Sequence, residues 1–535
     1  MPTPPPHPHH DRRDVRHSRR DVLRWAAAGA ALAGTAPFLS GCTSAASPVG
    51  SPEAGPARRG GRLRAGIVGG SAKDSLDAHR PVTHPDEARV IQLYDTLATY
   101  DTNFRVQLAL AEEITPSADA RIWTVRLRQD LEFHNGKPVT AEDVAYTLRR
   151  ITDPKDPKAG AAGLASVDPK RIDVVDPRTV RLTLAKPDAV LLDQFAQYQN
   201  GIVPVGYDPK RPVGAGPFAF TSFEPGQQSV FTRHPNYWRT NEPYLDEVVI
   251  IDFPDDSARV NALLSNQVDA IDQLPLGQLN VVKADGQLRV LESETGAWLP
   301  FTMRVDRPPF DDVRVRQAFR LIADREQMVR QVLGGHGVVG NDLYGRFDPC
   351  YAAELPQRTQ DIAKAKDLLR QAGKENLTVE LVTSAVAAGL VEAAQVFANQ
   401  AKAAGVTVKV RKVDPGEFYG DNYLKWDFAQ DFWFSRGYLP QTAQGSVPGA
   451  PYNETHWADP EFLRLIDKAR TTVDEKERCE LLGKAQRIEY DSGGYLIWGF
   501  PNQVDAHRAT VNGFVPDKTG IPLTAYGFRR VWLTA

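Results

Sequence analysis

The segment KWDFAQDFWFSRGYLP, residues 425–440, combines side chains that suit ligand binding. Arg436 stands there among the aromatic residues Trp433, Phe434 and Tyr438. A guanidinium stays charged in proteins and binds carboxylates or phosphates through paired hydrogen bonds. Aromatic rings beside it offer faces on which a ligand can stack. The alternative is that these rings belong to a protein core and that Arg436 is paired within the chain.

The common hydrolase motifs are missing from this sequence. G-x-S-x-G, S-x-x-K and H-E-x-x-H are all absent, and so is the phosphate-binding loop G-x-x-x-x-G-K-[ST]. A secreted glycosidase-like hydrolase stays open, because carboxylate spacing alone does not exclude one. A surface protein without a ligand also stays open. His456 could hold a metal chelate, although a single histidine is more often an ordinary polar residue. The missing motifs argue against the common hydrolases, and we expect no cofactor and no metal site.

The first 42 residues have the features of an export signal. SRRDVLR at 18–24 resembles a twin-arginine motif with Arg19 and Arg20 as its pair, and an Ala-rich stretch follows. LSGC at 39–42 resembles a lipobox, in which Cys42 is lipidated and the chain is cut before it. A transmembrane anchor is the alternative, but about 17 mildly apolar residues are marginal for spanning a bilayer. We therefore expect residues 1–41 to be removed and Cys42 to hold the protein on the outer face of the cytoplasmic membrane.

Composition narrows the remaining chain further. Residues 42–60 are rich in Ser, Pro, Ala and Gly, which predicts a flexible tether. The formal net charge is −3, and it becomes −6 without the six Arg and three Asp of the leader. A mildly acidic chain without a basic cluster argues against nucleic-acid binding. With Cys42 lipidated, Cys350 and Cys479 either pair in an oxidising compartment or remain two buried thiols.

The pattern after residue 60 is mixed α/β without an internal repeat. Apolar and polar residues alternate over 122–127, which predicts a strand. Thr140 followed by Asp143 resembles a capping box and begins a helix with an apolar face. Further helices are predicted over 313–333, 361–373 and 389–405, and the last runs into a predicted strand at 406–413. Helix-then-strand units of this kind indicate an α/β sheet lobe.

Four blocks of sequence carry a family resemblance. They are WTVRLRQDLEFHNGKPVTAEDVAYTLRR (123–150), PVGAGPFAFTSFEPGQQSVFTRHPNYW (212–238), PPFDDVRVRQAFRLIADREQMV (308–329) and DIAKAKDLLRQAG (361–373). In this order they resemble the solute-binding proteins of family 5, which feed ABC importers of peptides, nickel chelates and related solutes. With SLD at 75–77 and LYDTL at 93–97, the similarity covers most of residues 62–500. We expect the blocks to serve the fold: Gly136, Gly214 and Gly216 at turns that need an unhindered backbone, and Asp312 with Arg316 as a structural ion pair.

The resemblance implies an α/β, two-lobed periplasmic-binding-protein-like fold (type II, cluster C) that closes on a solute. Lobe I would gather residues 61–95, 197–290 and 491–535, and lobe II residues 291–490. A small extra domain would occupy residues 96–196. The resemblance also implies a binding protein and not an enzyme. The implied partners are a peptide or other small solute, the ABC permease and its ATPase subunits, and we expect the receptor to be a monomer.

The resemblance also bears on the ligand. In peptide binders of the family, a segment G-W-x-x-D-x-x-D-P supplies an aspartate for the peptide's amine, and matching Trp433 and Pro440 to it puts Arg436 in that place. A cation there repels an ammonium group. The ligand would then be anionic at this point, blocked at its amine or bound in another register. Trp298 lies on a strand implied to line the cleft, and a packing role is equally open. A peptide-like solute comes first, with an oligosaccharide or a metal chelate as alternatives.

Overall fold

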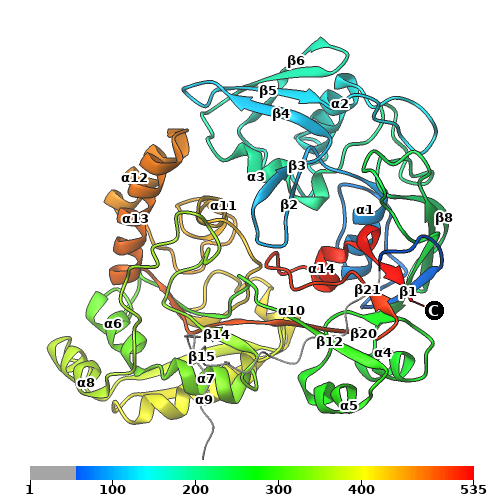
Figure 1. Ribbon diagram of the computed structural model, residues 1–535. Coiled ribbons are helices and arrows are strands. Elements are labelled where there is room, and N and C mark those ends of the chain that lie inside the picture. The colour runs from blue at the N-terminus through cyan, green and yellow to red at the C-terminus, as the bar shows by residue number, and fades with distance from the viewer. Residues whose placement is uncertain (1–55, 535) are drawn as a thin grey trace, which may run out of the picture. The chain divides into compact units, whose positions relative to one another are not determined.

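The computed structural model of this chain describes residues 56–534. Arg19, Arg20, Cys42 and most of the expected tether lie outside the described residues. Within 56–534, no helix combines the length and the apolar character needed to cross a membrane. Three sheets of four or more strands organise this part of the chain, and three two-stranded sheets accompany them (Figure 1).

A seven-stranded mixed sheet forms the core of lobe I. Its strands, in spatial order, are β12 (Leu288–Ser293), β20 (Gln503–Arg508), β11 (Ala270–Ile271), β1 (Arg62–Val68), β10 (Glu247–Phe253), β9 (Gln228–Arg233) and β8 (Phe218–Glu224). Strand β1 runs parallel to β10 and β11, and the other pairs are antiparallel. Helices α1 (His84–Leu93), α4 (Asp256–Leu264) and α5 (Leu279–Ala284) pack against this sheet. Since Leu63, Ala65 and Ile67 are fully buried, β1 lies at the centre of the lobe.

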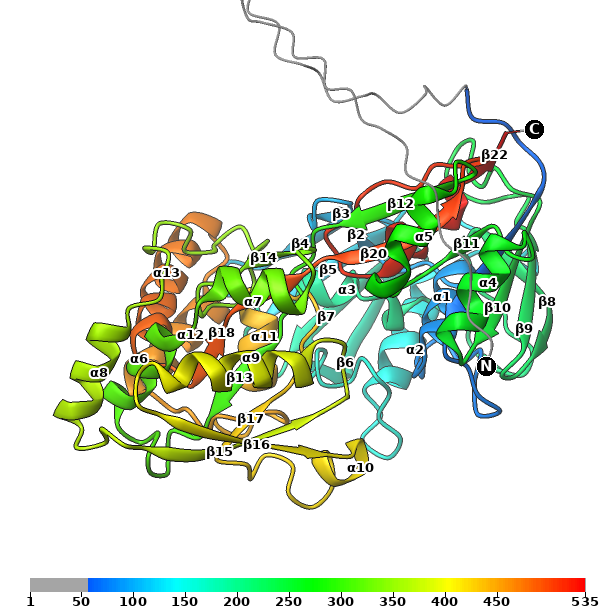
Figure 2. The ribbon, with the colours of Figure 1, turned by 90° about the horizontal axis from the view of Figure 1, so that it is seen from below.

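Lobe II is built on a five-stranded sheet. Its strands, in spatial order, are β16 (Thr407–Val413), β15 (Thr378–Ser384), β17 (Phe428–Gln430), β13 (Pro300–Met303) and β18 (Tyr495–Ile497). Helices α7 (Arg325–Val332) and α9 (Leu390–Lys402) lie over one face of it (Figure 2). Two helix pairs complete the lobe: α6 (Val313–Ile322) with α8 (Ile362–Gln371), and α12 (Pro460–Thr471) with α13 (Glu475–Ser492). Because β18 pairs with β13, residues 495–497 belong to this sheet, although the sequence placed 491–535 in lobe I.

The third sheet lies within the residues expected to form the extra domain. It is antiparallel, with the order β4 (Ala111–Pro116), β5 (Ile122–Leu127), β7 (Thr179–Leu184) and β6 (Val167–Asp176). Helix α2 (Ala141–Ile151) packs on β6 and β7. The predicted capping box is present, since the Asp143 carboxylate accepts a hydrogen bond from Thr140 N at 2.8 Å. Trp123, Val125 and Leu127 are buried, which confirms the alternation predicted for β5.

Two segments cross between the sheets of lobe I and lobe II. One joins β12 to β13 over residues 294–299, and the other joins β18 to β20 over 498–502. In the second crossing, β19 (Gly499–Pro501) pairs with β14 (Gly337–Val339). After β20 the chain stays in lobe I, where it forms α14 (Pro522–Tyr526) and the antiparallel pair of β21 (Val511–Asn512) with β22 (Trp532–Leu533).

The helix predicted over 313–333 is divided in the structure. α6 ends at Ile322, and Asp324 caps α7 by accepting a hydrogen bond from Gln327 N at 2.8 Å. The apolar periodicity continues through the break, so it could not reveal the second helix start.

The prediction of an ion pair between Asp312 and Arg316 is wrong. Asp312 instead pairs with Arg314 at 2.6 Å. The buried Arg316 guanidinium donates to backbone carbonyls, including those of Phe310 and Ser492. Carbonyl groups leave no signature in side-chain spacing, which is why the sequence suggested the nearest carboxylate.

Gly214 and Gly216 are needed for close packing, not for turns. A Cβ atom on Gly214 would lie 1.9 Å from Leu93 O, and one on Gly216 would lie 2.4 Å from Gln92 O. Both glycines therefore let their loop lie against the end of α1. Gly136, in contrast, has a φ of +79°, as expected for a turn.

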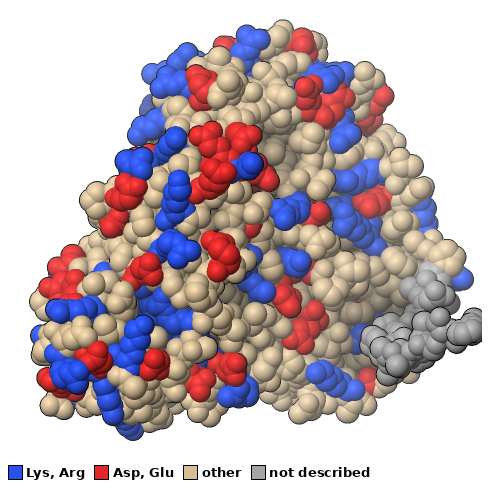
Figure 3. All heavy atoms as spheres, turned by 60° about the vertical axis from the view of Figure 1, so that its left-hand side comes forward, with Lys and Arg blue, Asp and Glu red and all other residues tan. Residues whose placement is uncertain are grey.

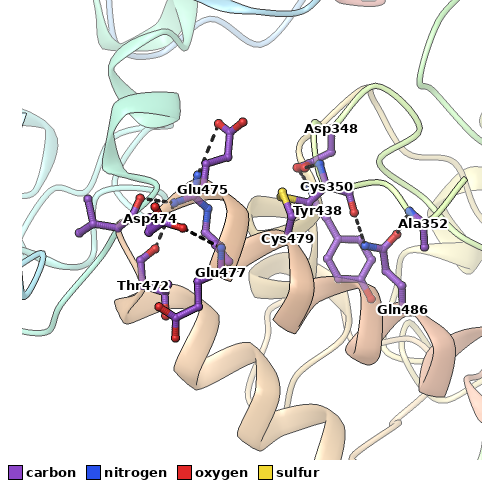
Figure 4. The surroundings of a disulfide bond; sticks show 12 residues. Asp348, Cys350, Ala352, Tyr438, Thr472, Asp474, Glu475, Glu477, Cys479 and Gln486 are labelled. Atoms are coloured by element: carbon purple, nitrogen blue, oxygen red, sulfur yellow. Dashed lines mark hydrogen bonds and ion pairs between the residues drawn. A yellow bond between two sulfur atoms is a disulfide. The ribbon is translucent and has the colours of Figure 1, made fainter.

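Cys350 and Cys479 form a disulfide that spans 129 residues of sequence and ties α13 to the loop before α8 (Figure 4). Asp348 lies beside it and accepts hydrogen bonds from Cys350 N at 2.8 Å and from Tyr438 N at 2.7 Å. Tyr438 begins helix α11 (Tyr438–Gly445). The cross-link therefore also supports the start of α11, two residues after Arg436.

Glu454 is an ionisable group buried in lobe II. It is 6% exposed, and neither of its carboxylate oxygens accepts a hydrogen bond from the described residues. Its neighbour Asp431 accepts hydrogen bonds from Tyr419 Oη at 2.7 Å and from Tyr423 Oη at 3.1 Å. Burial, and then the charge of Asp431, raise the pKa of Glu454 well above its ordinary value.

We expect Glu454→Gln to stabilise the protein at pH 8 and to leave its stability nearly unchanged at pH 4. The folded state holds the Glu454 proton more tightly than the unfolded state does. The stability that this tighter proton binding gives the folded state is therefore complete below the ordinary pKa of 4.5 and is lost as the pH rises. One such proton changes the unfolding free energy by up to about 1.4 kcal/mol per pH unit. Urea titrations at several pH values measure the effect, with Glu461→Gln as the exposed control. Parallel pH curves for Glu454→Gln and wild type would refute this role.

Candidate functional site

A cavity of about 210 Å³ lies between lobe I, the small domain and lobe II. Its lining includes residues of α1, the hairpin β2 (Ala98–Tyr100) and β3 (Val106–Leu108), residues 196–199, residues 434–436 and the C-terminal segment 517–530. The walls thus come from parts of the chain that are more than four hundred residues apart in sequence. The cavity is the best candidate for a ligand site in the described part of the protein.

Arg436 lines this cavity from lobe II. Its guanidinium donates to Gln441 Oε1 at a long 3.4 Å and lies 5.7 Å from the centre of the Trp433 ring. No carboxylate among residues 56–534 approaches the guanidinium within 4.0 Å, so the internal pairing left open by the sequence is absent there. Burial lowers the pKa of Arg436 from its ordinary value. A partly desolvated cation without an anionic partner favours an anion from outside the chain.

Of the aromatic candidates, only Phe434 lines the cavity beside Arg436. Its ring is 54% exposed. Trp433, Trp298 and Tyr438 instead form a continuous stack that includes Tyr344. Ring centres are 5.7 Å apart for Trp298 and Trp433, 5.3 Å for Trp298 and Tyr344, and 4.9 Å for Tyr344 and Tyr438.

This stack supports the cavity from behind. Trp298 is 1% exposed and Tyr438 is fully buried, and neither they nor Trp433 line the cavity. All three residues pack in the stack, in agreement with the packing alternative, and contact of any of them with a ligand stays a prediction. Contact of Phe434 and Arg436 with a ligand stays a prediction.

Helix α1 supplies the opposite wall and is held by a buried ion cluster. The Arg89 guanidinium is fully buried and donates to Asp74 at 2.9 Å, to Asp86 at 3.3 Å and to Asp252. Thr83 caps the helix by accepting a hydrogen bond from Asp86 N at 3.3 Å. These contacts fix the first two turns of α1, from which His84, Glu87 and Ile91 line the cavity.

Glu87 is the acidic group that α1 presents to the cavity. Its side chain is 12% exposed, and its closest cationic neighbour in the described chain is His84, with Nδ1 at 3.7 Å. His84 Nε2 lies 2.8 Å from Gln273 Nε2, which can only donate, so the proton of a neutral His84 sits on Nδ1 toward Glu87. Burial acts to lower the pKa of His84, but Glu87 and Asp272 outweigh it and the pKa is raised.

The other acidic and arginine side chains on the cavity wall have partners within the chain. Asp95 accepts a hydrogen bond from Trp238 Nε1 at 2.5 Å, and Asp517 accepts one from Thr519 N at 2.7 Å. Arg529 and Arg530 share Glu242, at 3.0 and 3.8 Å. Arg436, and Glu87 with its neighbour His84, are therefore the charged groups left to interact with a ligand.

The C-terminal wall has an unusual backbone. Four consecutive residues from Leu523 to Tyr526 have φ between 47° and 58°, in the left-handed region. Side chains hold the turn in place: Leu523 N donates to Asp505 at 2.7 Å, and Tyr526 Oη donates to Asp272 at 3.0 Å. Such backbone is costly and occurs mainly where the surrounding structure enforces it, often at ligand sites.

His456 lies outside the cavity. Its Nε2 atom is 2.9 Å from Leu424 O, and its Nδ1 atom is 3.5 Å from Asp306. No group of three or more His, Cys, Asp or Glu side chains suited to a metal ion occurs in residues 56–534. A metal-chelate site that uses His456 would need other ligands than the structure provides.

A sequence model of the bacterial extracellular solute-binding proteins, family 5 (middle part), matches residues 105–447. The chain belongs to this family. The match covers well over half of the sequence and includes both Arg436 and the aromatic stack.

Relatives of known name agree with this family 5 assignment. Di/tripeptide-binding protein 2 of Pseudomonas aeruginosa is 26% identical over 489 residues, which cover 84% of this chain and 90% of the relative. The dipeptide-binding protein of Escherichia coli is 25% identical over 484 residues, which cover 81% of this chain and 88% of the relative.

Solved structures of similar fold include two complexes. DppA from Helicobacter pylori bound to the peptide STSA has a TM-score of 0.74 at 22% identity, with 89% of this chain and 99% of DppA covered. AgaA from A. tumefaciens bound to agropinic acid has a TM-score of 0.73 at 24% identity, with 89% of this chain and 99% of AgaA covered. This chain therefore has the two-lobed α/β fold of the periplasmic binding proteins.

Several cavity residues of this family 5 protein could not be found from the sequence. Glu87 stands in the first turn of a helix, where acidic residues are common because they stabilise the helix start. Tyr198 and the segment 517–530 carry no motif. They reach the cavity only through the folding of distant parts of the chain onto one another.

Proposed function

We propose that this chain is the extracytoplasmic receptor of an ABC importer and that it captures a peptide or peptide-like solute between its lobes. Arg436 carries the proposal, because it is a cation without a carboxylate partner on the wall of a cavity between the lobes. The peptide-binding names of the relatives with 25–26% identity support this class of solute. The receptor binds without chemistry and hands the solute to a permease whose ATPase subunits supply the energy.

The same proposal includes the membrane anchor. Residues 1–41 would direct export by the twin-arginine route, and the lipid on Cys42 would hold a monomeric receptor on the outer face of the cytoplasmic membrane. A tether over residues 42–60 would keep the lobes close to the permease, which raises their effective concentration there. On the face drawn in Figure 3, acidic and basic side chains are interspersed.

Peptide-like solutes fit the cavity better than the alternatives. Oligosaccharide sites are rich in stacked aromatic rings, and although Tyr94, Tyr100, Phe104, Tyr198 and Phe434 line the cavity, none of the tryptophans in the described chain does. A chelate binder is less favoured because His456 points elsewhere.

Mass spectrometry on the full chain, extracted from membranes of its own host in detergent, tests both parts of the proposal. Under denaturing conditions, the expected mass is that of a chain that begins at Cys42 and carries covalent lipid. Under native conditions, an extra mass of a few hundred daltons should appear and fragment into amino acids. A sugar or chelate in its place would refute the peptide assignment, and an unmodified Cys42 would refute the anchor.

A further inference from the structure

Two opposite charges face one cavity from different lobes. Arg436 comes from lobe II and has no carboxylate within 4.0 Å among the described residues, while Glu87 comes from α1 of lobe I and has only His84 near it, at 3.7 Å. Every other carboxylate and arginine on the cavity wall is bound to the chain itself. Leaving the Arg436 charge without a partner at a half-buried site is unfavourable, and the 3.7 Å contact with His84 compensates the Glu87 charge only in part.

The two charges are also close enough to act on a common neighbour. Tyr198 lines the cavity, and burial raises the pKa of its phenol well above its ordinary value. Glu87 raises this pKa further, whereas Arg436 acts to lower it. Glu87, Tyr198 and Arg436 all line this cavity, and both charged groups lie within electrostatic reach of the Tyr198 phenol.

The size of the cavity limits what can lie between them. Pockets for drug-sized molecules typically enclose about 300–1,000 Å³, and the cavity here measures about 210 Å³. A ligand that reaches both charges is consequently small and carries a cation and an anion of its own. A short peptide with free ends has this chemistry, and so do other small zwitterions.

We propose that the solute is a compact zwitterion that binds with its carboxylate at Arg436 and its ammonium group at Glu87. The inference rests on the proposed function, since it takes the cavity to be the solute site. Its polarity is opposite to that of a site in which lobe II offers an acidic residue to the amine. Because each end of the ligand contacts a different lobe, a molecule that lacks either charge leaves one lobe without its partner.

Three forms of one dipeptide provide the test: L-alanyl-L-phenylalanine with free ends, with an acetylated amine and with an amidated carboxylate. Calorimetry measures their affinities for the wild-type full chain, Glu87→Gln and Arg436→Gln. Glu461→Gln, an exposed residue of α12 that pairs with Arg464, is the matched control. Acetylation and amidation should each weaken binding to wild type by about 30-fold or more, as expected for removal of one partner of a desolvated charge pair.

The combinations identify which end meets which residue. Glu87→Gln should weaken binding of the free dipeptide as strongly as acetylation does. It should nevertheless bind the acetylated form as tightly as wild type does. Arg436→Gln should weaken binding of the free dipeptide as strongly as amidation does, and it should bind the amidated form as tightly as wild type does. Unchanged affinity for these two modified dipeptides also shows that the variants are folded.

Other outcomes would overturn the inference. If Glu87→Gln weakens all three forms equally, or if Arg436→Gln responds to acetylation and not to amidation, the polarity is wrong while a peptide receptor remains. If wild type binds none of the three forms although mass spectrometry shows a bound peptide, the site does not select compact zwitterions. If the native mass shows a sugar or a chelate, the proposed function itself fails.

Discussion

Replacing Arg436 by Gln is expected to weaken binding of the natural solute by roughly 2–5 kcal/mol, the usual cost of removing one member of a buried charge pair. The same variant should leave the empty protein at least as stable as wild type. In the empty protein the guanidinium has only a 3.4 Å contact with Gln441 and no carboxylate, so its removal deletes an unpaired, partly desolvated charge. Function and stability should thus change in opposite directions.

Calorimetry with the purified solute and urea unfolding of the empty protein measure the two effects. Arg436→Lys should fall between wild type and Arg436→Gln in affinity, because an ammonium keeps the charge but loses the planar pair of donors. Arg464→Gln, which removes an exposed guanidinium paired with Glu461, is the control and should change neither quantity appreciably. If Arg436→Gln binds the solute as tightly as wild type, the carboxylate is bound elsewhere.

Removing the disulfide should produce the largest loss of stability. The bond between Cys350 and Cys479 closes 129 residues of chain, so it strongly restricts the unfolded state. Loop-closure entropy and measured cases together give a contribution of roughly 2–5 kcal/mol. The double variant Cys350→Ser with Cys479→Ser avoids a leftover thiol. Its free energy of unfolding should be lower by this amount, so that it unfolds at a lower urea concentration.

Reductant provides the internal control for this prediction. Wild type treated with reductant should unfold like the double variant, and the double variant should not respond to reductant at all. Equal midpoints for oxidised wild type and the double variant would mean that the cysteines are not paired in the protein, which was the alternative left open by the sequence.

Most of the fold could be predicted because local patterns and the family blocks agree. The alternation in β5 and the Thr140–Asp143 capping box are local features, and both are present as expected. Where the prediction failed, the cause was an interaction outside the local pattern. Arg316 binds carbonyls from a turn more than 170 residues away, and β18 joins the sheet of lobe II because of its long-range pairing with β13.

The site was less accessible from the sequence. The charge of Arg436 and its place among aromatic residues could be recognised, but spacing cannot distinguish a ring that faces a ligand from one that faces a core. Trp433, Phe434 and Tyr438 lie within six residues of one another, yet only Phe434 reaches the cavity. Glu87 was missed because its significance depends on Arg436, some 350 residues later and in the other lobe.

The stack of rings behind Arg436 gives the protein a built-in optical reporter. The indoles of Trp298 and Trp433 lie nearly parallel, with 10° between their planes, so their electronic transitions couple and give a circular dichroism signal in the near ultraviolet. The Arg436 charge stands 5.7 Å from the Trp433 ring and sets the electric field across it. A carboxylate that neutralises this charge alters the field and shifts the tryptophan emission. Occupancy of the site can therefore be followed by tryptophan fluorescence and circular dichroism in the unlabelled protein.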